Sequence, residues 1–299
     1  MKIQVVTIAA AITAGLIAGC GSGGSTSGTP ATSVTVSGAV ADGYLVGATV
    51  FLDKNGNYRL DTGEPSTTTD ANGAYTLTVD PADVGKYPIV AMAVKGVTID
   101  KDTNLPVQGS YILSMPQDSV SGTVSGNFIS PMSTQIRELM ATGKYTMQQA
   151  MDLMSTKIGL PAGTDMLANY MANPNSANNQ AMHTAAQNMA SLMGSQMGQV
   201  FTGSGSTTTV DVNRYRGMMG TIFSNMSSIR GSGINSQSAM TTLMGNMTAN
   251  LPSITAGQPY RNMSASFRGG MMGGGAGTTS GGGMMGSTTG TSGGSMMGQ

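Results

Sequence analysis

The sequence predicts an α+β chain, in which an N-terminal antiparallel β-sandwich is followed by a small Met-rich α-helical domain and a disordered tail. Three observations lead to this prediction. Apolar and polar residues alternate in short runs from Val34 to Val94, which is the period of half-buried strands. From Pro131 onward apolar residues recur every three or four positions, as in amphipathic helices. Between Gly269 and Gln299 the chain has no charged residue and consists mainly of Gly, Ser, Thr and Met.

The chain begins with MKIQVVTIAAAITAGLIAGC, which contains one Lys, an apolar run and the only cysteine of the protein. This run is too short for a durable membrane span and is typical of a secretory signal peptide, which we place at residues 1–19. The stretch from Ile17 to Cys20 resembles the lipobox of bacterial lipoproteins. The resemblance implies that Cys20 is acylated and becomes the mature N-terminus. The alternative is an ordinary signal peptide followed by an incidental cysteine.

The residue after the cysteine indicates in which membrane the lipoprotein would be anchored. Lipoproteins that stay in the inner membrane usually have Asp at that position, whereas this chain has Gly21. The resemblance therefore implies a lipid anchor in the outer membrane, with the protein on the periplasmic face or at the cell surface.

After Cys20, a Gly-, Ser- and Thr-rich segment ending at residue 33 has the composition of a flexible linker. The alternating runs that follow are separated by Asp-Gly, Asn-Gly and Pro, so we assign residues 34–128 to a β-sandwich domain. The expected strands centre on Val36, Val50, Leu77 and Met92.

Residues 129–265 form the predicted helical domain. Ser130 and Pro131 suit a helix start, and Gly143 suits its end. Thr146 and Gln149 have the spacing of a capping box for a second helix, which Gly159 would terminate. A third helix is expected after Pro174, and weaker helical patterns cover residues 212–229 and 237–250. Residues 266–299 cannot bury enough apolar surface to offset the entropy of ordering, so we expect them to be disordered.

The composition argues against two classes of function. Only 9% of the residues are charged and the formal net charge is zero, so a nucleic-acid-binding surface with clustered Lys and Arg is not expected. Catalytic groups are scarce: the single histidine, His183, lies beside a Met stripe and suits a packing or surface role. A G-x-S-x-G match at residues 290–294 lies in the low-complexity tail without a preceding strand. We therefore interpret the protein as a non-enzyme with no catalytic residues.

The run DKNGNYRLDTGE, residues 53–64, is the main candidate for a metal site. A Ca²⁺ loop of the EF-hand type takes oxygen ligands from its positions 1, 3, 5, 7, 9 and 12. These positions are filled by Asp53, Asn55, Asn57, Arg59 through its carbonyl, Asp61 and Glu64. Position 6 is Tyr58 instead of the usual Gly, and a left-handed backbone there would cost about 1 kcal/mol. With only three carboxylates the predicted calcium site is weak, and the alternative is a polar turn without an ion.

A wider stretch resembles a known family of modules. Its residues are Gly38, the pair Asp42-Gly43, the pair Gly47-Ala48, the loop at 53–64 and the run from Thr69 to Gly73. They resemble the prealbumin-like modules of bacterial surface proteins, namely the collagen-adhesin B-type and carboxypeptidase-regulatory-like domains. The resemblance implies a seven-stranded sandwich that serves as a stalk, spacer or binding platform without catalysis.

Methionine suggests an alternative function. The chain has 27 Met, and those in the helical patterns have the spacing of core residues. The tail instead contains three Met pairs on Gly-rich chain, and thioethers select Cu(I) or Ag(I). These candidate soft-metal ligands are Met271, Met272, Met284, Met285, Met296 and Met297.

Taken together, these features predict a non-enzymatic outer-membrane or surface lipoprotein with a weak structural calcium loop. It would act as an adhesion or scaffold component for an unknown protein or glycan partner. The alternative is a periplasmic protein that binds Cu(I) or Ag(I) through its Met-rich segments.

Overall fold

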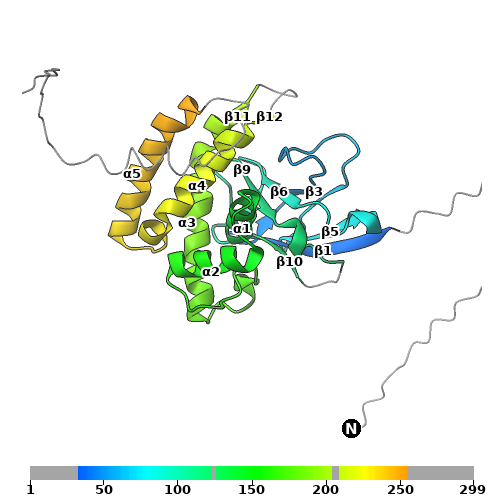
Figure 1. Ribbon diagram of the computed structural model, residues 1–299, viewed down its shortest axis with the longest axis horizontal. Coiled ribbons are helices and arrows are strands. Elements are labelled where there is room, and N and C mark those ends of the chain that lie inside the picture. Colours follow the sequence, from blue (N-terminus) through cyan, green and yellow to red (C-terminus); the bar gives the residue numbers. More distant parts are fainter. Residues whose placement is uncertain (1–32, 123–125, 204–208, 255–299) are drawn as a thin grey trace, which may run out of the picture. The chain divides into compact units, whose positions relative to one another are not determined.

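The computed structural model describes residues 33–122, 126–203 and 209–254 (Figure 1). β-Strands occupy the N-terminal part of these residues, and helices follow, which confirms an α+β fold. The described residues from Ser33 onward belong to one compact unit. Strands and helices contribute to one continuous hydrophobic core.

Two larger sheets form the strand-rich part. In the first, β1 (Val34–Val40) lies between β5 (Ala74–Val79) and β10 (Asn127–Ile129). The second is fully antiparallel and has the order β4 (Ser66–Thr68), β3 (Thr49–Leu52), β6 (Ile89–Ala93), β9 (Tyr111–Met115).

Short elements complete this part. A small sheet has the order β2 (Leu45–Val46), β7 (Ile99–Asp100), β8 (Leu105–Pro106). A two-stranded ribbon joins β11 (Phe201–Thr202) to β12 (Thr209–Val210). Single 3₁₀ turns occur at η1 (Pro81–Asp83), η2 (Gln117–Ser119), η3 (Tyr170–Ala172) and η5 (Leu251–Ser253).

The expectation of purely antiparallel strands is wrong for β10. This strand runs parallel to β1, with Gly38 opposite Asn127. The Asn127 side chain donates to the carbonyls of Ser37 and Ser121, which joins β10 to β1 and to the preceding loop. A β-carbon on Gly38 would lie 1.9 Å from the Asn127 carbonyl oxygen, so the pairing requires glycine at this position.

Five helices follow the sheets within the described residues. They are α1 (Pro131–Ala141), α2 (Met147–Ile158), α3 (Ala177–Val200), α4 (Val212–Ile229) and α5 (Ile234–Asn250). Ser130 caps α1, Thr146 and Gln149 form the predicted capping box of α2, and Gly159 ends α2 with φ 82°. The structure thus has a helix at each predicted place, although α5 begins at Ile234, three residues before the predicted start. None of the described helices combines the length and the apolarity that a membrane span requires.

The helices change the environment of the second sheet. Strand β5 alternates between buried and exposed residues, as expected for a half-buried strand. Every residue of β9 and most residues of β3 and β6 are buried instead. The reason is visible in the contacts of β9: Ser133 of α1 donates to the Ser114 carbonyl, and Tyr215 of α4 donates to the Ile112 carbonyl. Helices α1 and α4 therefore cover the face of this sheet that the alternating sequence pattern predicted to be exposed to solvent.

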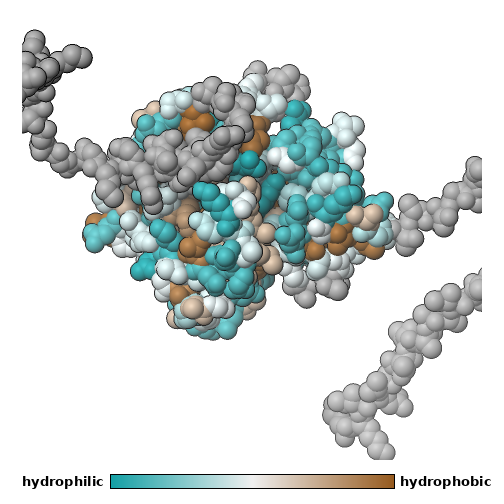
Figure 2. Space-filling model, viewed as in Figure 1, coloured by the Kyte–Doolittle hydropathy of each residue, from teal (hydrophilic) through white to brown (hydrophobic). Residues whose placement is uncertain are grey.

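Methionine fills much of the helical core. The fully buried methionines of the two longest helices are Met182, Met189, Met193 and Met197 of α3 and Met218, Met219 and Met226 of α4. Their flexible thioethers pack in the irregular spaces between helices α3, α4 and α5, which lie side by side in Figure 1. Most of the face seen in Figure 2 is hydrophilic.

Candidate functional site

The loop at residues 53–64 connects β3 to β4, and Asp53 organises its first half. The Asp53 side chain is fully buried. Its Oδ1 accepts the backbone N–H groups of Gly56 at 2.8 Å and Asn57 at 3.1 Å, and its Oδ2 accepts that of Tyr58 at 3.2 Å. The Asp53 carboxylate thus accepts three consecutive backbone N–H groups and holds the first half of the loop in place.

Glu64 and Asp61 organise the second half. Glu64 accepts the backbone N–H of Lys54 at 2.7 Å and that of Asp61 at 2.9 Å, which joins the two ends of the loop. Asp61 Oδ2 accepts the side-chain amides of Asn55 at 2.8 Å and Asn57 at 2.6 Å. These two amide donors lower the pKa of Asp61 below its ordinary value.

The structure therefore brings the five side chains of the predicted calcium set into one loop. Arg59, the sixth residue, donates its backbone N–H to Asn57 Oδ1, and its Nε lies 3.9 Å from Asp61 Oδ1. Every carboxylate of the set already accepts hydrogen bonds from the loop itself.

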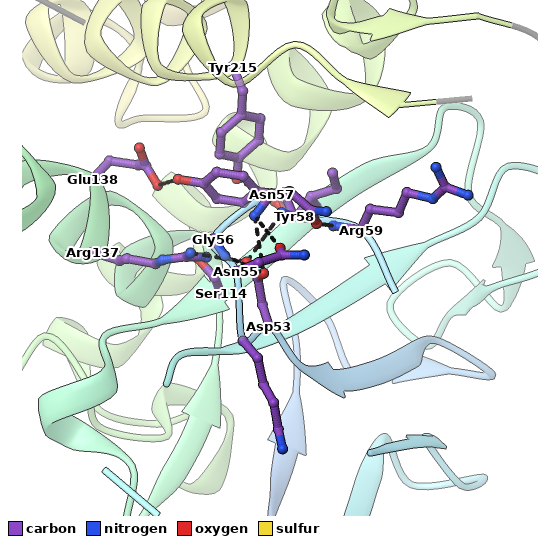
Figure 3. Close-up of polar contacts among 12 residues, drawn as sticks. Asp53, Asn55, Gly56, Asn57, Tyr58, Arg59, Ser114, Arg137, Glu138 and Tyr215 are labelled. Atoms are coloured by element: carbon purple, nitrogen blue, oxygen red, sulfur yellow. Dashed lines mark hydrogen bonds and ion pairs between the residues drawn. The ribbon is translucent and has the colours of Figure 1, made fainter. Parts of the chain in front are cut away.

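Tyr58, at the position where EF-hand loops usually have Gly, has φ 60° and adopts the left-handed backbone. Its side chain is fully buried and points away from the loop towards the helices (Figure 3). The Tyr58 O–H donates to Glu138 of α1, and its ring lies 4.6 Å from the ring of Tyr215 of α4. The Arg137 guanidinium lies 4.3 Å from the centre of the Tyr58 ring. The Tyr58 side chain thus anchors the loop on α1 and α4.

Two buried carboxylates around Tyr58 are paired with arginines. Arg137 Nη2 lies 3.3 Å from Asp53 Oδ2, and Arg216 Nε lies 3.6 Å from Glu138 Oε2. Burial, reinforced by the charge of Glu138, raises the pKa of Tyr58 above its ordinary value, so the phenol remains a hydrogen-bond donor. The sequence pattern contained no sign of these contacts, because Tyr58 and Glu138 are far apart along the chain.

This arrangement limits what the loop can bind. Arg137 pairs with Asp53 and Arg59 pairs with Asp61, so Glu64 is the carboxylate of the set without an arginine beside it among the described residues. Over the three described ranges, no group of three or more His, Cys, Asp or Glu side chains is arranged to hold a metal ion. A cation in the loop would therefore depend on the oxygens of Asn55 and Asn57 as well as on carboxylates.

The remaining candidate residues, namely Cys20, the six tail methionines and His183, do not belong to the loop at 53–64. Cys20 and the six methionines of the tail lie outside the described residues. His183 of α3 contacts Asp102, with its Nε2 2.6 Å from Asp102 Oδ2, and stacks on Tyr170. Comparison of the chain with protein-family models, with curated proteins and with solved structures gave no match.

Proposed function

We propose that this protein is a non-enzymatic lipoprotein of the outer membrane or cell surface, which acts as an adhesion or scaffold component. We further propose that the loop at 53–64 is a weak structural calcium site. The lipoprotein proposal rests on the lipobox-like stretch that ends at Cys20. The observation that supports a structural role for the loop is its position, because Tyr58 joins it to α1 and α4. An ion bound there would stiffen the connection between the sheets and the helices. A rigid connection suits a protein that bears load or spaces a partner from the membrane.

The resemblance to prealbumin-like modules leads us to propose that the two larger sheets are the halves of a seven-stranded β-sandwich. The three-stranded sheet and the four-stranded sheet together have this number of strands. We propose that surfaces of this module bind a protein or glycan partner and do not bind nucleic acid.

Calcium binding would require a local rearrangement. The NH₂ groups of Asn55 and Asn57 now face Asp61, so both amides would have to rotate to offer their oxygens to an ion. The rotation would give up the hydrogen bonds that these oxygens accept from the backbone N–H groups of Asn57 and Arg59. Each such bond contributes about 0.5–1.5 kcal/mol, so the rearrangement weakens the site. The proposed affinity suits the millimolar calcium found outside cells.

Calcium is expected to raise the melting temperature of the protein. An ion that binds only the folded state stabilises it by about 1.4 kcal/mol at a tenfold excess over Kd. We expect a rise of a few degrees in Ca²⁺, reversed by chelator, and no rise in Glu64→Ala. The measurement is thermal unfolding of the chain without residues 1–19.

A matched control for this experiment is Asp118→Ala, which removes an exposed carboxylate from η2 and should leave the response to calcium intact. A melting temperature that is the same in calcium and in chelator would identify the loop as a polar turn that closes on its own hydrogen bonds.

Lipid attachment is expected to depend on Cys20. The protein should fractionate with outer membranes, and mass spectrometry of its N-terminal peptide should show an acylated cysteine. Cys20→Ala should release the protein from the membrane or mislocalise it, whereas Ser22→Ala should not. An unmodified thiol on a soluble product would rule out the anchor.

The alternative proposal, binding of Cu(I) or Ag(I), would use the Met pairs of residues 271–297. The methionines in the cores of α3 and α4 are unsuitable ligands, because they are fully buried against one another and against other apolar side chains.

A further inference from the structure

Three carboxylates converge where β1 passes into β2. Asp42 follows β1, Asp100 ends β7, and Asp102 lies in the turn between β7 and β8. A β-carbon on Gly43 would lie 2.5 Å from Asp100 Oδ1 and 2.6 Å from Asp102 Oδ2, so both carboxylates cover the backbone beside Asp42. The backbone holds this arrangement in place, because Asp100 pairs with Leu45 and Lys101 N–H donates to the Tyr44 carbonyl.

Asp42 is the buried member of this group. Its side chain is 8% exposed, and its Oδ2 accepts the Tyr111 O–H at 2.9 Å. Its Oδ1 is buried and has no hydrogen-bond partner in the described structure. Burial raises the pKa of Asp42 to about 7; the Tyr111 hydrogen bond opposes this shift, and the charges of Asp100 and Asp102 add to it. A buried oxygen without a donor is costly as part of a carboxylate and is relieved when the group is protonated.

Helix α3 and the 3₁₀ turn η3 also contact this region. His183 Nε2 lies 2.6 Å from Asp102 Oδ2, and Gln187 Nε2 donates to the same oxygen at 2.8 Å. The His183 ring stacks on Tyr170, whose O–H donates to the Ala41 carbonyl at 2.9 Å. Contacts from the end of β1, from the β7–β8 turn and from α3 therefore meet within one small region.

The remaining charged or titratable neighbours do not neutralise the carboxylates. Lys101 Nζ donates to the Ala71 carbonyl at 3.1 Å. Burial raises the pKa values of Tyr111 and Tyr170 well above the ordinary value, so both phenols stay protonated donors. Tyr44, the other phenol nearby, contacts Asn169. Protonation of Asp42 is therefore the means by which this region can reduce its negative charge.

We propose that Asp42, Asp100, Asp102 and His183 form a proton-operated contact, which holds the β7–β8 turn against α3 firmly in mild acid and more loosely at higher pH. In mild acid, neutral Asp42 places no buried charge beside Asp100 and Asp102, and His183 and Gln187 hold Asp102 on α3. At higher pH the ionised Asp42 adds a buried negative charge beside these two carboxylates. This proposal is independent of calcium and of the lipid anchor.

The sign of the pH effect follows from linkage. The pKa of Asp42 in the folded protein, about 7, lies above the ordinary value of 3.8. Between these two pH values the folded state binds a proton that the unfolded state has lost, so stability from this group falls as pH rises. Its contribution is complete below about pH 4 and is lost as pH rises through about 7.

One variant with a matched control and one direct titration test the proposal. Asp42→Asn mimics the neutral acid, so its melting temperature relative to the wild type should rise between pH 5 and pH 8, by about 3 °C or more. Asp118→Asn, at an exposed carboxylate, should keep a constant difference from the wild type.

The titration uses ¹³C chemical shifts of the aspartate carboxyl groups in the wild-type protein. One resonance, assigned by its loss in Asp42→Asn, should have a midpoint above pH 6. A midpoint near 4, or a pH profile of Asp42→Asn parallel to that of the wild type, would overturn the proposal. If Asp42→Asn does not fold, assignment of the Asp42 carboxyl resonance through its own backbone in the wild type still decides the question.

Discussion

Tyr58→Ala is expected to lower the free energy of unfolding by about 3–5 kcal/mol, the usual cost of truncating a fully buried aromatic side chain. The substitution removes the ring that packs on Tyr215 and the donor that satisfies Glu138. It leaves the left-handed backbone in place, so no strain is relieved in return. Urea denaturation of the wild type and the variant measures the loss.

Two further substitutions separate the contributions of Tyr58. Tyr58→Phe keeps the ring but leaves the buried Glu138 oxygen without its donor, for a loss of about 1–3 kcal/mol. Tyr58→Gly should be more stable than Tyr58→Ala by up to about 1 kcal/mol, because glycine adopts φ 60° without strain. Tyr145→Ala is the control, since Tyr145 is 37% exposed, and its effect should be small. A loss for Tyr58→Ala as small as that of Tyr145→Ala would show that the loop is not anchored through this side chain.

Gly109→Ala is expected to destabilise the protein by about 3 kcal/mol, at the upper end of the usual cost of overpacking. Gly109 precedes β9 and lies against Gly194 of α3. A β-carbon on Gly109 would lie 2.3 Å from the Gly194 carbonyl oxygen and 2.6 Å from its carbonyl carbon. Both atoms belong to backbone inside a long helix, so relief of the clash requires the bend at Gly109 and α3 to move apart.

The same helix provides matched controls for Gly109→Ala. A β-carbon on Gly194 would meet its nearest neighbour at 3.5 Å, which is ordinary contact, and one on Gly198 would meet nothing within 4 Å. Alanine favours a helix over glycine by roughly 0.5–1 kcal/mol, so Gly198→Ala should stabilise the protein, and Gly194→Ala should be neutral or stabilising. Equal effects at Gly109 and Gly194 in urea denaturation would contradict the close approach of α3 to the strand.

The helices were predictable because their signals lie within a few residues of one another. Ser130 with Pro131, Thr146 with Gln149, and Gly159 each satisfy or end the adjacent turn without help from elsewhere in the chain. The strand positions were predictable for a similar reason, since alternation is a local pattern. The burial of β3, β6 and β9 was not, because it depends on α1 and α4 covering their sheet, and those helices come later in the chain.

In the loop at 53–64, local sequence and tertiary structure determine clearly different features. The spacing of Asp53, Asn55, Asn57, Asp61 and Glu64 by itself determined that these side chains share one turn, because each bonds to backbone or amide groups a few residues away. Only the tertiary structure decided that Asp53 faces Arg137 and that Tyr58 enters a buried site between α1 and α4. It likewise decided that His183 meets Asp102. Hydrogen-bonded turns depend on near neighbours, whereas buried charge pairs depend on which distant segments exclude water together, and that follows from packing of the whole chain.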